Sequence, residues 1–159
     1  MKLSQLVAPE RITIGWPANK SQGESDKWHL IRDAVFFISE QIGFTNAERD
    51  EALKLVLERE ESMTTGIGEG VALPHASLPF LKNMVASMSI FSEGIQFDSI
   101  DRKPAYIFIL ILVPKNQFQR HIRTLASIAR LMNEPDFRSE LITQIDPQAI
   151  FDLIQSRES

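Results

Sequence analysis

Hydrophobic residues recur at spacings of three and four in the first third of the chain, and this period predicts amphipathic helices. One stripe begins after Ser25, which we expect to cap the helix, and stops at Gly43; its members are Trp28, Ile31, Val35, Ile38 and Ile42. Thr45 followed by Glu48 forms a capping box, which predicts a second helix running to about Glu60. The buried face of this second helix should consist of Ala52, Leu55 and Val56.

The pattern changes to β-prone apolar runs in the middle of the chain. The run at 105–113 is almost continuously apolar, which predicts a central strand buried on both faces. Turn residues on either side of 95–97 predict a short hairpin or edge strand there. The remaining strands are expected at 11–15, 71–73 and 85–91.

Helical spacing returns after the connecting loop at 114–117. The stripe of this helix is Phe118, Ile122, Leu125, Ala129 and Met132. Two shorter helices are expected at 135–144 and 147–155, each with a proline near its first turn. Strands and helices interspersed in this way predict a layered α/β domain.

Length and composition narrow this picture to one domain spanning residues 1–159. The 159 residues, 43% of them hydrophobic, suit one sizeable core, and the small polar segment 17–24 is expected to be a mobile loop. A formal charge of −4 without a run of Lys and Arg argues against nucleic acid as the main partner. No apolar stretch resembles a secretory signal or is long enough for membrane insertion, so we expect a cytoplasmic protein.

The candidate chemistry lies in the stretch from Arg59 to His75, REESMTTGIGEGVALPH. Gly66, Gly68 and Gly70 can let backbone N–H groups approach an anion, and Arg59 supplies a planar cation. His75 supplies a nitrogen that is nucleophilic at neutral pH, so the stretch suggests phosphoryl transfer through histidine. The glycines match neither the GxxxxGK[ST] loop nor the dinucleotide fingerprint, which argues against a nucleotide site.

Structural explanations remain open for each of these residues. The glycines can simply connect a helix to a strand, and His75 can end a strand and bond a neighbouring carbonyl. His121 lies beside the apolar stripe of its helix, so it should be half-buried and can be a residue at the edge of the core. His29 reads as a surface or packing residue. Cysteine is absent, and no His or carboxylate spacing indicates a metal site or a need for a cofactor.

Three segments together resemble the enzyme IIA proteins of the bacterial phosphoenolpyruvate-dependent sugar phosphotransferase system, in the fructose and mannitol class and nearest to the nitrogen-regulatory type. They are REESMTTGIGEGVALPH, RHIRTLASIARLM and DFRSELITQIDPQAIFDLI, and the similarity spans almost the whole chain. Its specific core is TGIGxGxAxPH in register with Arg59 upstream and His121 downstream.

This resemblance implies a three-layer α/β/α fold, in which a mixed, mainly five-stranded sheet carries helices on both faces. It implies that His75 accepts a phosphoryl group from the small histidine-containing phosphocarrier protein (HPr). It further implies that His121 hydrogen-bonds to that group and that Arg59 neutralises its charge. The residues expected to line the site are Thr65, Gly66, Gly68 and Glu69.

The resemblance also bears on partners. Nitrogen-type proteins commonly have Asn in place of Glu69 and Gly-Lys in place of Ala76-Ser77, so the methyl of Ala76 is expected to tighten the approach of a partner. Because the sequence ends at Ser159 without a permease module, a regulatory output through target proteins is expected. The alternatives are a component serving a sugar permease and a protein-binding module of the same fold that is not phosphorylated.

Overall fold

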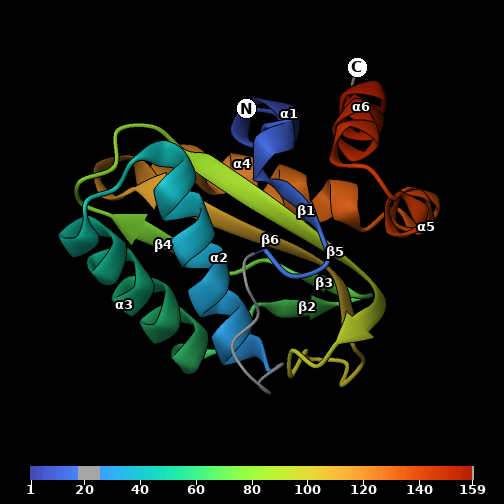
Figure 1. The fold of residues 1–159 in the computed structure, drawn as a ribbon, viewed down its shortest axis with the longest axis horizontal. Helices are drawn as coiled ribbons and strands as arrows, with labels where there is room; N and C mark the ends of the chain where they lie inside the picture. The colour runs from blue at the N-terminus through green and yellow to red at the C-terminus, as the bar shows by residue number, and fades with distance from the viewer. Residues whose placement is uncertain (18–25, 159) are drawn as a thin grey trace.

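A mixed β-sheet forms the centre of the molecule and carries helices on both faces (Figure 1). The computed structural model describes residues 1–17 and 26–158. The strands are β1 (Ile12–Ile14), β2 (Gly66–Gly68), β3 (Val71–Ala72), β4 (His75–Leu78), β5 (Val85–Ile95) and β6 (Ala105–Pro114). The helices are α1 (Leu3–Leu6), α2 (Lys27–Ile42), α3 (Asn46–Ser62), α4 (Phe118–Met132), α5 (Pro135–Thr143) and α6 (Pro147–Glu158), with short 3₁₀ turns η1 (Pro9–Arg11) and η2 (Lys115–Gln117).

The sheet has six strands that occupy five positions side by side. The order is β1-β5-β6-β3-β2, and β4 pairs with the same edge of β6 as β3 does. Val71 lies opposite Ile107 and His75 lies opposite Ile111, so the register is the same in both strands. Pro74 interrupts them because it lacks an N–H for the ladder. The expected α/β fold is therefore confirmed, and the five-stranded arrangement holds if β3 and β4 count as one broken strand.

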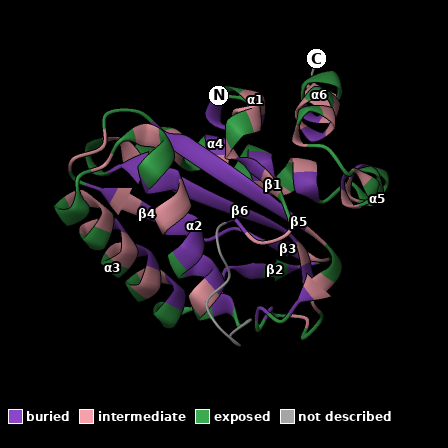
Figure 2. Cartoon of the chain, viewed as in Figure 1, coloured by how far each residue is buried: buried purple, intermediate pink, exposed green. Residues whose placement is uncertain are grey.

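Side chains of β6 alternate between two hydrophobic cores, as expected for a strand covered on both faces. Ile107, Ile109 and Ile111 pack under α1, α4, α5 and α6, whereas Phe108 and Leu110 pack under α2 and α3. Figure 2 shows the buried β5 and β6 strands running through the middle of the molecule between these helices. This confirms the predicted central strand and gives the molecule three layers.

The starts and stops of the first two long helices follow their sequence signals closely. The side chains of Thr45 and Glu48 cap the N-terminus of α3 reciprocally, as predicted. Gly43 ends α2 in the left-handed conformation with φ of 80°, which glycine adopts without strain. The N-cap of α2 is Asp26, whose carboxylate accepts the His29 amide, and not Ser25 as predicted. Residues 18–25 of the chain, including most of the expected loop at 17–24, lie outside the described residues.

Two local predictions are wrong. No separate strand forms at 95–97, because β5 bulges after Ile90 and rejoins the ladder at Ile95 opposite Ala105. The strand therefore runs past the turn signal at Gly94. Helix α4 begins at Phe118 as predicted, but Ile122 is 42% exposed because the buried face is rotated toward Thr124, Ile128 and Met132.

The two ends of the described chain lie together. The Glu158 carboxylate at the end of α6 accepts the backbone N–H groups of Leu3 and Ser4, which have no partner within the short helix α1. The two labelled termini accordingly lie on the same side of the molecule in Figure 1. Across residues 1–17 and 26–158, no helix is both long and apolar enough to cross a membrane.

Candidate functional site

His75 is the first residue of β4, where the broken edge strand resumes after Pro74. Ala76 and Leu78 point into the core beneath α2 and α3, so by alternation the half-buried His75 side chain faces the α4 side of the sheet. Its Nδ1 lies 3.0 Å from the carbonyl oxygen of Leu73. Because a carbonyl can only accept, Nδ1 carries the proton of the neutral ring and Nε2 keeps its lone pair. The carbonyl bond that the sequence left open is present, although His75 begins β4 and does not end a strand. This bond leaves Nε2 as the nucleophilic nitrogen.

Burial lowers the pKa of His75 below its ordinary value of 6.5. The bond to the Leu73 carbonyl raises this pKa, the positive charge of Arg59 lowers it and the negative charge of Glu60 raises it, and the net shift is downward. The ring is therefore neutral at pH 7. A neutral imidazole is the form that can attack an electrophile.

The lowered pKa of His75 predicts how stability depends on pH. Between its pKa in the folded protein and 6.5 the unfolded chain binds more protons than the folded one, so the free energy of unfolding decreases as pH falls through this window. The pKa of His121 is also lowered, so His121 likewise reduces the free energy of unfolding as the pH falls. Urea unfolding at pH 7.5 and at several values below 6.5 should show this loss, and the His75→Gln variant should show less of it. Equal losses in both proteins would contradict the prediction.

Arg59 lies in the last turn of α3, as predicted, and is half-buried. One guanidinium nitrogen donates to the Met63 carbonyl at 2.9 Å, which holds the side chain at the end of the helix. The guanidinium has further N–H groups for an anion. Its positive charge is near enough to His75 to lower the pKa of the imidazole.

His121 lies in the first turns of α4 and is half-buried, as expected. Helix α4 covers the face of the sheet toward which His75 points. Nε2 of His121 lies 3.3 Å from Oε1 of Gln117. Burial lowers the pKa of His121, and the positive charges of Arg120 and the N-terminal ammonium lower it further. Within the described part of the chain, no hydrogen bond joins His121 to His75 or Arg59. The structure thus places the two histidines on one face of the sheet without a direct bond.

The glycine segment folds as a tight β-hairpin. β2 and β3 pair antiparallel with Gly68 opposite Val71, and the two residues between them, Glu69 and Gly70, have φ of 57° and 81°. Two successive positive φ values are the signature of a type I′ hairpin turn. A Cβ atom at Gly66 would lie 2.3 Å from the Ser99 hydroxyl oxygen, so this glycine permits a close approach of two chain segments. The structure therefore gives these glycines a structural explanation.

Three backbone amides expected to line a phosphoryl site already donate within the protein. The Thr65 amide donates to Glu60, the Gly66 amide to the Thr64 hydroxyl and the Glu69 amide to Asp101. These acceptors lie 2.9–3.1 Å from the amide nitrogens. An anion would have to displace them to use these donors.

The hairpin also separates the predicted site residues along its length. Thr65 accepts the Leu73 amide, which lies two residues from His75. Glu69 lies at the far end, where the neighbouring Gly70 pairs with Tyr106 of β6. His75 is opposite Ile111, so at about 3.3 Å per residue the two ends are roughly 16 Å apart. Gly68 and Glu69 therefore lie away from His75, and the exposed Glu69 carboxylate contacts Arg138 instead.

The expectation for Ala76 is wrong. Ala76 is 5% exposed and its methyl belongs to the core beneath α2 and α3. Successive residues of a strand point to opposite faces, so the side chain after His75 must point away from it. This methyl group cannot tighten the approach of a partner to His75.

Two charged residues near the site were not singled out by the sequence. Glu60 and Lys27 are 2% and 5% exposed, and their charged groups lie 3.1 Å apart. The burial of Glu60 could have been found from its spacing, because it follows the buried positions Ala52 and Val56 at intervals of four. A charged residue on a buried helix stripe requires a buried partner.

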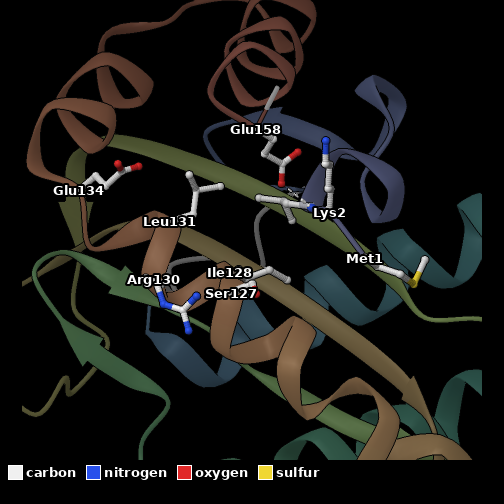
Figure 3. A pocket seen from close by; sticks show the side chains of 9 residues that line it. Met1, Lys2, Ser127, Ile128, Arg130, Leu131, Glu134 and Glu158 are labelled. Carbon is white, nitrogen blue, oxygen red and sulfur yellow. Dashed lines mark hydrogen bonds between the residues drawn. The ribbon is translucent and has the colours of Figure 1, made fainter.

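A hollow of about 380 Å³ lies elsewhere, between α1, α4 and the end of α6. Figure 3 shows Lys2, Arg130, Glu134 and Glu158 around it, with the Glu158 carboxylate bonded to the start of α1. It contains none of the predicted site residues, so its size does not make it the reactive site. Among the described residues no cluster of His and carboxylate groups could hold a metal ion.

Comparison with known proteins adds family evidence. Residues 25–157 match the family described as phosphoenolpyruvate-dependent sugar phosphotransferase system, EIIA 2. A nitrogen regulatory protein of Bradyrhizobium diazoefficiens is 30% identical over 154 residues, covering 97% of this chain and 95% of that protein. A fructose-specific EIIA component of Haloferax volcanii is 35% identical over 107 residues, covering 67% and 70% of the two chains.

A solved structure supports the fold. The nitrogen regulatory protein IIA-Ntr from Neisseria meningitidis superposes with a TM-score of 0.81 at 20% identity. The superposition covers 95% of this chain and 97% of the other. The arrangement of sheet and helices is thus shared with a IIA protein.

Proposed function

The chain belongs to the EIIA 2 family of the phosphoenolpyruvate-dependent sugar phosphotransferase system, and from this premise we propose that it is a phosphocarrier whose His75 accepts a phosphoryl group from an HPr-type protein. The observation that carries the proposal is the bond from Nδ1 of His75 to the Leu73 carbonyl. It leaves Nε2 as the nucleophilic atom on a ring that is neutral at pH 7.

The proposed step transfers one phosphoryl group between two imidazoles. The lone pair of His75 Nε2 attacks the phosphorus of phospho-HPr in line, a nitrogen–phosphorus bond forms, and the bond to the donor histidine breaks. The attack draws electrons from the ring, and the Nδ1–H bond to the Leu73 carbonyl stabilises the resulting positive charge. No proton has to leave His75 during the step.

Arg59 is proposed to stabilise the charge on the phosphoryl oxygens. Phosphoryl transfer spreads negative charge over three equatorial oxygens, so positioned cations and donors supply most of the catalysis. Only one guanidinium nitrogen of Arg59 donates to the Met63 carbonyl, so its other N–H groups are suited to this role. Because their amides donate internally, we assign Thr65 and Gly66 a supporting position beside Leu73 and β3. Gly68 and Glu69 lie at the far end of the hairpin, so we leave them out of the reactive site.

His121 is proposed as a hydrogen-bond donor to the transferred group. The His121→Ala variant should still accept phosphate but about tenfold more slowly, as expected for the loss of one hydrogen bond. Quenched-flow transfer from phospho-HPr measures this rate. A wild-type rate would remove His121 from the site, and a complete loss of the adduct would make it essential for acceptance.

Incubation of the protein with phosphoenolpyruvate, the general phosphotransfer enzyme and HPr tests the function. Intact mass should show one added phosphoryl group that is lost in acid. No adduct would favour a protein-binding module of the same fold that is not phosphorylated.

The output of the phosphorylated protein is proposed to be regulatory, since the Bradyrhizobium relative, which covers nearly the whole chain, is a nitrogen regulatory protein. The fructose-specific relative supports the second candidate, a component that passes phosphate on to a sugar permease. Pull-downs with phosphorylated and unphosphorylated protein should separate these: target proteins indicate regulation, whereas a permease domain that takes up the phosphoryl group indicates transport.

A further inference from the structure

Glu60 is a buried carboxylate that the proposed phosphoryl chemistry does not use directly. It lies on α3 next to Arg59 and is 2% exposed. Lys27 of α2 donates to its Oε2 at 3.1 Å, and the amide of Thr65 donates to the same oxygen at 2.9 Å. The Thr65 hydroxyl donates to the other oxygen, Oε1. Both oxygens of a buried carboxylate are thus satisfied by Lys27 and Thr65.

A continuous series of hydrogen bonds leads from this carboxylate to His75. The Thr65 carbonyl accepts the Leu73 amide at 3.0 Å. The Leu73 carbonyl accepts the His75 Nδ1–H at 3.0 Å. Glu60 therefore binds Thr65, and Thr65 binds Leu73. The Leu73 carbonyl in turn fixes the proton of His75 on Nδ1.

We propose that Glu60, with its charge balanced by Lys27, is a positioning residue that fixes the tautomer and orientation of His75 through Thr65 and Leu73. This inference rests on the proposed function, in which Nε2 of His75 is the reactive atom. Thr65 immediately precedes β2, so a two-point anchor there sets where β2, and with it β3, begins.

A carboxylate suits this task because its two oxygens accept the amide and the hydroxyl of one residue at once. Burial strengthens these bonds, since water does not compete for them. Glu60 also acts on His75 through its charge, which raises the pKa of the imidazole and opposes the effect of Arg59. Glu60 is thus coupled to His75 through a series of hydrogen bonds and through its charge.

The alternative is that Lys27 and Glu60 only join α2 to α3. Removing one partner alone does not separate the two roles, because an uncompensated buried charge costs about 3–5 kcal/mol in stability. The double variant Lys27→Met/Glu60→Leu removes both charges and both bonds to Thr65 at nearly constant volume. Its matched control is Lys54→Met/Glu58→Leu, the same changes at exposed positions of α3.

The readout that a purely structural role would not move is the tautomer of His75, measured by ¹⁵N NMR of the imidazole above pH 7.5. In the wild type and the control we expect the Nδ1–H form alone. In Lys27→Met/Glu60→Leu we expect a mixture of the two tautomers and about tenfold slower acceptance of phosphate per folded molecule. A folded double variant with the wild-type tautomer and rate would overturn the inference.

If the double variant does not fold, Thr65→Val decides. It keeps the amide bond to Glu60 and removes only the hydroxyl bond, so we expect a smaller shift toward the mixed tautomer. An unchanged tautomer in Thr65→Val would then overturn the inference. The tautomer is measured without any phosphoryl donor, so this result does not depend on the phosphorylation assay. A wild-type protein that forms no adduct would refute the proposed function, whereas the tautomer alone tests the role of Glu60.

Discussion

The His75→Ala variant is expected to form no phosphorylated species when incubated with phosphoenolpyruvate, the general phosphotransfer enzyme and HPr. The reason is chemical: alanine has no atom that can form a bond to phosphorus, and the proposed step needs the Nε2 lone pair. The variant should lose little folding stability, because the ring is only half-buried and makes one hydrogen bond to Leu73. Intact mass after a long incubation measures the loss, which should be complete.

The His29→Ala variant is the matched control. His29 also lies at the start of an element, but its Nδ1 bonds to the exposed carboxylate of Asp26, the N-cap of α2. This variant should be phosphorylated fully and at the wild-type rate. The chain has three histidines, so an adduct that persists in His75→Ala would move the acceptor to His121 or His29 and refute the assigned site.

The Arg59→Met variant is expected to accept phosphate on the order of 10²- to 10³-fold more slowly than the wild type, which is the usual cost of losing a group that stabilises charge in the transition state. Methionine keeps the length and apolar contacts of the side chain and removes its charge. Because Arg59 lowers the pKa of His75, its removal should also move the acid limb of the rate–pH profile to higher pH. Rapid-quench rates from phospho-HPr at several pH values measure both effects.

Arg49→Met is the control for a lost charge on the same helix. Arg49 lies on α3, pairs with Asp50 and stacks over Phe36. It precedes Arg59 by ten residues, which is about 15 Å along the helix. The Arg49→Met variant should have the wild-type rate of phosphate acceptance and the wild-type rate–pH profile. An Arg59→Met rate within about twofold of the wild type would exclude Arg59 from the transition state, since a twofold change corresponds to well under 1 kcal/mol.

Much of the fold could be predicted because helical spacing and capping are local signals. The capping box at Thr45 and Glu48 and the glycine stop at Gly43 appear in the structure where the sequence places them. The central strand at 105–113 could be predicted because its apolar run is rich in β-branched residues and suits a strand covered on both faces.

The hairpin of β2 and β3 could not be predicted from the sequence in the same way. Its turn uses Glu69 before Gly70, and glutamate lacks the preference for positive φ that Asn and Asp give to such turns. From the sequence alone the glycines suggest amide donors for an anion, and a plain helix-to-strand connection stays open beside that reading. Long-range packing against Ser99 and Asp101, which the sequence does not display, explains them as a hairpin.

Within the candidate site, the nucleophile was easier to predict than its support. His75 follows a proline and bonds a carbonyl two residues back, which is a local contact. Lys27 and Glu60 are 33 residues apart and belong to the residue types that are least often buried. Spacing on the helix could indicate that Glu60 is buried, but only the packing of α2 on α3 identifies Lys27 as its partner.

The most direct test of the account is to locate the phosphoryl group on the protein itself. Protein labelled with ¹⁵N at histidine, phosphorylated through HPr and examined by ¹⁵N–³¹P correlation NMR, should show one phosphorus coupled to Nε2 of His75. Phosphorus coupled to Nδ1 of His75, or to either nitrogen of His121, would contradict the account, as would the absence of any coupled phosphorus.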